Sequence, residues 1–364
     1  MRGRRHSLWV RTLGLTAALL ASGAVATSSA PAAEIPAATS PFSGTALWIK
    51  QVPSQSTPQA LAAQATQSGA RTLFVKAADG STPDPQFTPA LVAGLRAAGV
   101  SVCGWTFAYG QSPLGEAAAA VAAVRSGAQC LVVDAEGQYD KLYGAAQLFV
   151  SSLRSQLGPR FPIGLAGQAE VLQHPTFPYS VFLGPGGFDF DMPQIYWREL
   201  GVSVDAAYAA TIGSNAIYGR PIVPVGQIFG APAPTALARF RALARAYGSP
   251  GASFFDLDAA LPEALAALAA PVVRLARRPV VAPTLHAGAD GDEVVWAQEL
   301  LDAAGAHLPV GGFFGAQTAR ALARFQARHR LRPNGVLGPA TWRALMRLRP
   351  REPSWAGGPP DSAR

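Results

Sequence analysis

The sequence predicts a TIM-type (β/α)8 barrel followed by a small all-α domain of three helices. Between residues 42 and 270, eight short apolar segments end in polar or aromatic residues, and Ala/Leu-rich helical stretches lie between them. Eight such units in about 230 residues match the usual size of this barrel, about 250 residues. A doubly wound open sheet is the alternative, but no glycine-rich phosphate loop supports it.

The composition indicates a globular protein with a large core, because 49% of its 364 residues are hydrophobic and only 14% are charged. Residues 1–33 have the layout of a secretory signal peptide, in which four arginines precede an apolar run and small residues follow. An uncleaved membrane anchor is the alternative, but the run is short for a span. We therefore expect a secreted or cell-wall-associated protein without stable membrane insertion after cleavage.

The net charge does not favour a nucleic-acid partner. Without the four N-terminal arginines, the formal charge of +8 falls to about +4, which is only mildly basic. Such a charge is compatible with an anionic surface such as a cell wall.

The expected barrel, residues 42–270, follows a linker at residues 34–41. Its strands are expected at Thr45–Gln51, Arg71–Ala77, Val100–Tyr109, Gln129–Glu136, Pro162–Gln168, Asp191–Trp197, Ile222–Phe229 and Ser253–Asp258. Its helices are expected at Pro58–Ser68, Pro89–Ala98, Leu114–Ser126, Tyr143–Leu157, Val204–Ile212, Thr235–Tyr247 and Pro262–Ala269. The connection through residues 177–187 is rich in Pro and Gly and is expected to be irregular.

Two cysteines, Cys103 and Cys130, each precede a polar strand end by six residues. If those strands are neighbours in register, the two sulfur atoms lie side by side. A disulfide and two buried free thiols both agree with this pattern. The five histidines are scattered without ligand spacing, so we expect no metal site and no cofactor.

The fourth strand ends in two carboxylates, Asp134 and Glu136. At this spacing both side chains leave the same face of a strand. Two carboxylates at the end of a buried strand repel each other and lose hydration, so stability does not explain them. A structural ion-pair network at a barrel rim is the alternative to a catalytic pair.

The other strand ends carry aromatic, amide and charged residues. Since active sites of such barrels lie at the C-terminal ends of the strands, these residues are candidates for substrate binding. They are Trp48, Lys50, Lys76, Trp105, Tyr109, Gln168, Glu170, Gln194, Tyr196, Trp197, Gln227, Asp256 and Asp258. Aromatic faces stack on sugar rings and the polar groups bind hydroxyls, so the mixture predicts a carbohydrate site.

The carboxylate pair suits glycoside hydrolysis, which needs a protonated acid and a second carboxylate. Glu136, nearer the mouth, is expected to be the general acid and base. Asp134, deeper and near Lys50 or Lys76, is expected to remain ionised as a stabilising partner or nucleophile, and its charge favours the protonated form of Glu136. If the sugar carries a 2-acetamido group, that group can be the nucleophile while Asp134 orients it.

Four segments resemble family 25 glycoside hydrolases, the N-acetylmuramidases: residues 74–80 (FVKAADG), 133–136 (VDAE), 194–197 (QIYW) and 255–258 (FDLD). The resemblance implies a glycosidase acting on peptidoglycan, with Glu136 as acid and base and Asp134 as its partner. Those enzymes carry an Asp on the first strand, where this chain has Trp48 and Lys50. A non-catalytic wall-binding barrel and a glycosidase for another polysaccharide therefore remain alternatives.

After a linker at residues 271–283, residues 284–349 resemble the peptidoglycan-binding domain 1 repeat, a three-helix module. The resemblance implies binding to cell-wall peptidoglycan. A tight turn is expected at Asn334-Gly335. The core is expected to contain Val294, Leu301, Phe313, Leu322, Phe325, Leu331 and Trp342. Arg320, Arg324 and Arg328 recur every four residues, as an anion-binding row or a merely solvated face. The tail, residues 350–364, is expected to be disordered.

Overall fold

The structure is a computed structural model that describes residues 40–169, 171–351 and 353–355. The predicted signal peptide, most of the linker at residues 34–41 and the candidate Glu170 lie outside the described residues.

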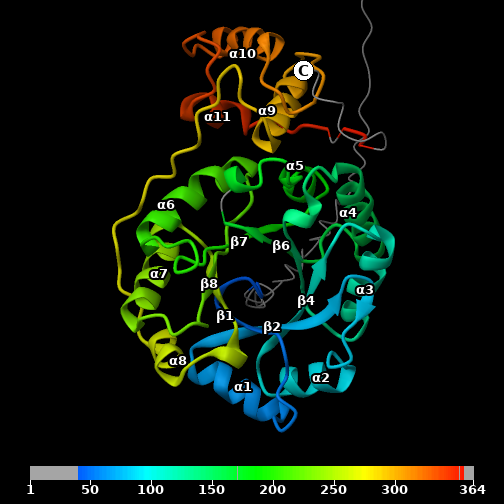
Figure 1. Cartoon of the computed structure of the whole chain (residues 1–364), viewed down its shortest axis with the longest axis vertical. Helices are drawn as coiled ribbons and strands as arrows, with labels where there is room; N and C mark the ends of the chain where they lie inside the picture. Colours follow the sequence, from blue (N-terminus) through cyan, green and yellow to red (C-terminus); the bar gives the residue numbers. More distant parts are fainter. Residues whose placement is uncertain (1–39, 170, 352, 356–364) are drawn as a thin grey trace, which may run out of the picture. The chain divides into compact units, whose positions relative to one another are not determined.

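Eight parallel strands of the described chain form a closed barrel, which Figure 1 shows with its ring of helices. The ring closes because β1 pairs with both β2 and β9. The strands are β1 (Gly44–Ile49), β2 (Ala70–Asp79), β4 (Ser101–Ala108), β5 (Leu131–Ala135), β6 (Ile163–Gln168), β7 (Phe190–Gln194), β8 (Val225–Gln227) and β9 (Gly251–Phe255). The predicted barrel is thus confirmed, and a two-residue strand, β3 (Thr82–Pro83), adds a short hairpin to β2.

The helices alternate with the strands, as predicted. They are α1 (Pro58–Gln67), α2 (Pro89–Ala97), α3 (Pro113–Arg125), α4 (Tyr143–Leu157), α5 (Tyr179–Leu183), α6 (Val204–Asn215), α7 (Pro234–Tyr247) and α8 (Pro262–Ala269). Thr57, Thr88 and Ser203 each accept a backbone N–H at a helix start, which explains these starts. The short helix α5 lies in the connection that was expected to be irregular, because five residues carry too little periodicity to be detected.

The inside of the barrel is filled by side chains from every second strand position. Cys103 and Cys130 belong to this interior and form a disulfide. The register pairs Gly104 with Leu131, which places the two cysteines beside each other at the start of β5. The predicted neighbourhood is therefore confirmed, and of the two alternatives the structure has the disulfide.

The C-terminal region folds into three helices, α9 (Asp292–Ala303), α10 (Ala316–Arg328) and α11 (Pro339–Leu345). Two buried glutamines hold the turns between them. Gln298 accepts the N–H groups of residues 311 and 312 between α9 and α10. Gln326 accepts the Gly335 N–H between α10 and α11 and donates to the Val336 carbonyl, and the φ of +69° at Gly335 explains the glycine in the predicted tight turn.

Five of the seven predicted core residues of this module are fully buried, but Phe313 is not. Phe313 is 47% exposed, whereas the adjacent Phe314 is completely buried. Leu331 is only partly buried. Because two phenylalanines are adjacent, the pattern alone could not distinguish which one turns inward, and the expectation for Phe313 was wrong.

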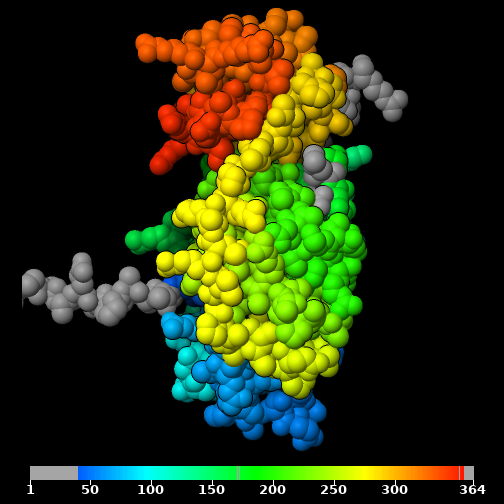
Figure 2. Space-filling model, turned by 90° about the vertical axis from the view of Figure 1, so that its left-hand side faces the viewer, coloured from blue at the N-terminus to red at the C-terminus, as the bar shows by residue number. Residues whose placement is uncertain are grey.

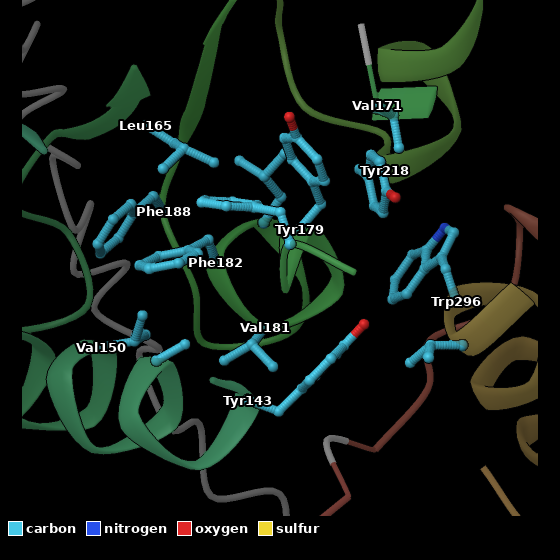
Figure 3. Close-up of a cluster of buried hydrophobic side chains, with 14 of the residues drawn as sticks. Tyr143, Val150, Leu165, Val171, Tyr179, Val181, Phe182, Phe188, Tyr218 and Trp296 are labelled. Atoms are coloured by element: carbon cyan, nitrogen blue, oxygen red, sulfur yellow. The ribbon is translucent and has the colours of Figure 1, made fainter. Parts of the chain in front are cut away.

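The first helix of the module packs against the barrel through a buried carboxylate. Asp292 is completely buried and accepts four hydrogen bonds from barrel groups: Tyr143 Oη (2.9 Å), Ser180 N (2.8 Å), Ser180 Oγ (2.7 Å) and Tyr218 Oη (2.8 Å). Trp296 adds an indole N–H donated to the Ile217 carbonyl at 2.7 Å. Figure 3 shows Tyr218 of the barrel beside Trp296, and their ring centroids lie 6.0 Å apart. The module and the barrel therefore share one core.

The segments before and after the module also pack on the barrel. In the linker, drawn in yellow in Figure 2, Arg278 donates its backbone N–H to the Ala246 carbonyl of α7 and lies 3.5 Å from Asp205 of α6. In the tail, Trp355 is 2% exposed and its ring centroid lies 4.6 Å from that of Tyr143. The expectation of a disordered tail was wrong for Trp355, because an aromatic residue so close to the module finds an apolar surface to cover; residues 356–364 lie outside the described part.

Candidate active site

Asp134 and Glu136 lie together at the C-terminal end of β5 and are joined by one amide. Gln194, at the end of β7, donates from the same Nε2 atom to Asp134 Oδ1 at 2.7 Å and to Glu136 Oε1 at 3.1 Å. Asp134 is 9% exposed and Glu136 is partly exposed. The two carboxyl groups therefore share one face, as the spacing predicted, and Glu136 is the one open to solvent.

The surroundings of Asp134 act against the ionised form that was expected. Burial raises the pKa of Asp134 well above its ordinary value, and the charge of Glu136 raises it further. The hydrogen bond from Gln194 and the charge of Lys76 lower the same pKa, but these two effects are smaller. The direction of this shift goes against the expectation that Asp134 remains ionised, since desolvation outweighs the nearby lysine. Burial thus favours the protonated form of Asp134.

Lys76 belongs to a second polar group on β2 and β4. Its ammonium lies 2.7 Å from Asp79 Oδ2 and 5.5 Å from the ring centre of Trp105. Tyr109 Oη donates to the other oxygen of Asp79 at 2.7 Å. The hydrogen bond from Lys76 is the main reason that the pKa of Asp79 is lowered. Three residues from two strand ends thus form one charged cluster, and its lysine also acts electrostatically on Asp134.

The acids at the end of β9 mainly support the backbone. Asp258 accepts the backbone N–H groups of Lys50 and Gln51 at 3.2 and 3.3 Å, which ties the end of β1 to β9. Asp256 is buried, and burial raises its pKa, with the charge of Asp258 adding to the effect. Lys50 is exposed, and its charge lowers the pKa of Asp256 as well as that of Asp79.

The tryptophans predicted to bind substrate are placed differently from the expectation. Trp48 and Trp105 point into the barrel but are only 2% and 3% exposed, so they form its packed interior and are not open to a sugar ring. Trp197 points out of the barrel and packs against Phe240 of α7. These three expectations are corrected, because strand ends alone do not tell the depth of a side chain and alternation sends Trp197 to the face opposite Tyr196.

Tyr196 is the predicted aromatic residue that reaches the carboxylates. Burial raises its pKa well above the ordinary value, and Asp134 and Glu136 are the nearest charges that raise it further. Its ring contacts Phe229 and Phe255, at centroid distances of 5.4 and 6.3 Å. Phe255 also contacts Trp48 and was missed by the sequence analysis. Alternation from Ser253 could have found it, since Phe255 and not Asp256 shares the inward face.

The two remaining candidate amides, Gln227 and Gln168, differ in whether they are available to a ligand. Gln227 is 2% exposed, and its Oε1 accepts the Arg198 N–H at 2.9 Å, so it holds the backbone and is not available to a ligand. Gln168 is partly exposed at the end of β6, in register with Gln194. Gln168 therefore remains a candidate for substrate binding, beside the bridging amide.

Comparison with known proteins supports the fold of the barrel and the identity of the C-terminal module. Residues 290–345 match the family described as putative peptidoglycan binding domain. No curated protein matches the chain.

Similar solved structures include a class V chitinase from Pseudomonas fluorescens Pf-5, with 10% identity, a TM-score of 0.50, and coverage of 62% of this chain and 98% of that one. The spore cortex-lytic enzyme SleL of Bacillus cereus has 8% identity, a TM-score of 0.48, and coverage of 65% and 76%. A chitinase from Chromobacterium violaceum has 11% identity, a TM-score of 0.45, and coverage of 62% and 98%. At these identities the likeness shows the fold alone.

The described residues hold no group of three or more side chains arranged to bind a metal ion. In the same part of the chain, no helix has the length and apolar character needed to cross a membrane. What the geometry offers chemically is a partly exposed carboxyl group beside a buried one, held by a shared amide and flanked by a tyrosine. This arrangement can transfer a proton and bind a polar substrate group.

Proposed function

We propose that the chain is an exported glycoside hydrolase of the cell wall, with Glu136 as general acid and base and Asp134 as its neutral partner. The observation that carries this proposal is the Gln194 amide, which holds both carboxyl groups at the C-terminal end of the barrel. The match of residues 290–345 to a peptidoglycan-binding family supports peptidoglycan as the polymer. A wall binder attached to the barrel raises the local substrate concentration.

The spacing of the carboxyl groups favours a reaction that retains the anomeric configuration. Asp134 Oδ1 and Glu136 Oε1 both accept a hydrogen bond from Gln194 Nε2, at 2.7 and 3.1 Å, so these two oxygens are less than 6 Å apart. Inverting enzymes need about 6.5–9.5 Å to place a water between the two groups, and retaining enzymes about 5–5.5 Å. The pair therefore lacks room for the water of an inverting reaction.

The neutral state of Asp134 favours a sugar that supplies its own nucleophile. A protonated carboxyl group is a poor nucleophile, but it can donate a hydrogen bond to an acetamido group of the substrate. In the proposed reaction, Glu136 protonates the leaving glycosidic oxygen while the acetamido oxygen attacks C1. Glu136 then takes a proton from the water that opens the resulting ring. Glycans with 2-acetamido sugars, such as peptidoglycan, fit this chemistry, and an N-acetylmuramidase of the family 25 type is the specific form that the sequence motifs favour.

Release of new reducing ends from purified wall sacculi tests the proposal. The wild-type protein is expected to release them, and Asp134→Asn to lose most of this activity. A sacculus preparation with its 2-acetamido groups removed is expected to be cleaved at least about 100-fold more slowly, the size of effect that loss of a positioned nucleophile or proton donor produces. Equal rates on both preparations would exclude the acetamido group as nucleophile.

A non-catalytic wall-binding barrel is the second candidate. It is favoured by the end of β1, where Lys50 stands and the neighbouring Trp48 is sealed in the interior. Binding to sacculi without any release of reducing ends would establish this function in place of hydrolysis.

A further inference from the structure

The C-terminal module has a strongly segregated charge. Residues 303–349 contain eight arginines and no Asp or Glu. All eight arginine side chains are exposed. We call this set the arginine surface: Arg320, Arg324, Arg328, Arg330, Arg332, Arg343, Arg347 and Arg349.

Helix α10 carries three of these arginines and turns them outward. Helix α10 buries Leu322 and Phe325 on its inner face, which leaves Arg320, Arg324 and Arg328 in one row on its outer face. Residues four apart advance about 6 Å along a helix, so this row spans about 12 Å. Figure 2 shows the orange and red segment of α10 and α11 with an uncovered outer side. The row is therefore accessible to a large ligand.

Carboxylates do not neutralise this surface. Three of the module's acids lie on α9 and are buried, namely Asp292, Glu293 and Glu299. In the described part of the chain, none of the eight arginines forms an ion pair. Packing of α9 against the barrel thus removes acids from the surface and leaves the cations. Eight like charges repel one another unless an anion binds them, so the surface is matched to a polyanion.

We propose that the arginine surface binds a phosphodiester-linked polymer carried by the cell wall. The guanidinium group matches phosphate oxygens with two parallel hydrogen bonds, and a phosphodiester keeps its charge across the physiological pH range. A flexible polymer with one phosphate per repeat can follow the row on α10. Uncharged glycan hydroxyls would leave the eight charges unpaired, so the peptidoglycan glycan alone does not account for them.

Binding of the full-length protein to two wall preparations tests this inference. One preparation retains its covalently attached phosphodiester polymer, and the other has lost it through hydrofluoric acid, which cleaves phosphodiesters. The triple variant Arg320→Gln, Arg324→Gln and Arg328→Gln is compared with a matched control, Arg71→Gln, Arg125→Gln and Arg160→Gln, which removes the same charge from exposed barrel positions. The melting temperature of each variant confirms that it is folded.

The wild-type protein and the control variant are expected to bind the intact wall at least about tenfold more tightly at 50 mM than at 200 mM salt, and more tightly than the stripped wall. The α10 variant is expected to lose most of this difference, with a salt slope smaller by about 2 for three lost phosphate contacts. Equal binding to both preparations would overturn the inference. Arginine-dependent binding to nucleic acid or anionic vesicles but not to wall phosphate would also overturn it. Since only binding is measured, failure of the hydrolase proposal leaves this test intact.

Discussion

Two pairs of acidic residues, one at the end of the barrel and one between the barrel and the C-terminal module, differ in their partners. Asp134 and Glu136 lie at the end of the barrel, where Asp134 has a single donor, Gln194. Asp292 and Glu293 lie between the barrel and the C-terminal module, where Asp292 receives four hydrogen bonds. Burial raises the pKa of both aspartates, but the hydrogen bonds from Ser180, Tyr218 and Tyr143 counteract the shift at Asp292, whose pKa reaches about 6. The number of donors therefore separates a group available for chemistry from a group that joins two parts of the fold.

The largest expected effect concerns the exposed member of the first pair. Glu136→Gln removes the proposed proton donor, so the release of reducing ends from sacculi should fall by about 10²–10⁴-fold while the melting temperature stays unchanged. Glu263→Gln, an exposed glutamate at the start of α8, is the matched control and should keep full activity. Wild-type activity in Glu136→Gln would remove Glu136 from the mechanism.

The same substitution at the two buried aspartates should affect stability to very different extents. In Asp292→Asn, an amide NH2 group replaces one carboxylate oxygen. This NH2 group then faces two hydrogen-bond donors that have lost their acceptor, so we expect a loss of about 3–4 kcal/mol in the free energy of unfolding. In Asp134→Asn, the amide oxygen can still accept from Gln194 and no charge is placed in the buried site, so the free energy should change by less than about 1 kcal/mol. Chemical denaturation measures both values. An equal loss in the two variants would contradict the distinction between the pairs.

Stability should decrease as the pH rises through the range where the second pair titrates. The folded state raises the pKa of Asp292 to about 6 and that of Glu293 to about 7, from ordinary values of 3.8 and 4.5. At a pH between the unfolded-state and folded-state pKa values, the folded protein holds more protons on these two groups than the unfolded chain does. Their contribution to stability is therefore greatest below about pH 4 to 5 and falls as the pH approaches 7.

From pH 5 to pH 8 we expect a loss on the order of 4 kcal/mol, because the folded-state pKa lies about one unit above pH 5 for Asp292 and about two units above it for Glu293, and each unit corresponds to about 1.4 kcal/mol. Thermal unfolding across this range measures the loss. Glu293→Gln should flatten the dependence, whereas the exposed Asp302→Asn on the same helix should not. A melting temperature that rises over this range would refute the assignment.

The smallest expected effect concerns the amide that joins the first pair. Gln194→Leu removes the donor shared by Asp134 and Glu136, so their relative orientation is less restricted. We expect about a tenfold loss of activity and a stability loss of about 1 kcal/mol, the usual net value of a hydrogen bond. A loss of activity as large as that of Glu136→Gln would show that Gln194 takes part in the reaction directly.

The sequence was sufficient for the elements and for the position of the carboxylate pair, because both depend on local patterns. The strands, the longer helices, the Asn334-Gly335 turn and the shared face of Asp134 and Glu136 follow from periodicity and turn chemistry. Depth and solvation are not local, so the sequence placed Trp48 in an open site, and burial acts against the ionised form expected for Asp134. Alternation of side chains along a strand places Trp197 on the outer face and Phe255 on the inner face.

The interface between the barrel and the module could not be predicted from either part alone. Asp292 occupies the first position of a helix, where an acid is ordinary, and only the donors of Tyr143, Ser180 and Tyr218 explain its burial. These donors are spread over three separate segments of the barrel. No pattern in the sequence connects them to residue 292.

The shared interface has a consequence for how such proteins can be recombined. Cutting the chain at residue 283 would separate two recognisable domains but leave the hydroxyl groups of Tyr143 and Tyr218 without their acceptor and uncover the surface beneath Trp296. A module taken from another protein would fit here only if it brought an acid at the position of Asp292 and an indole one turn later. The unit that can be exchanged intact between proteins therefore includes both the barrel and its module.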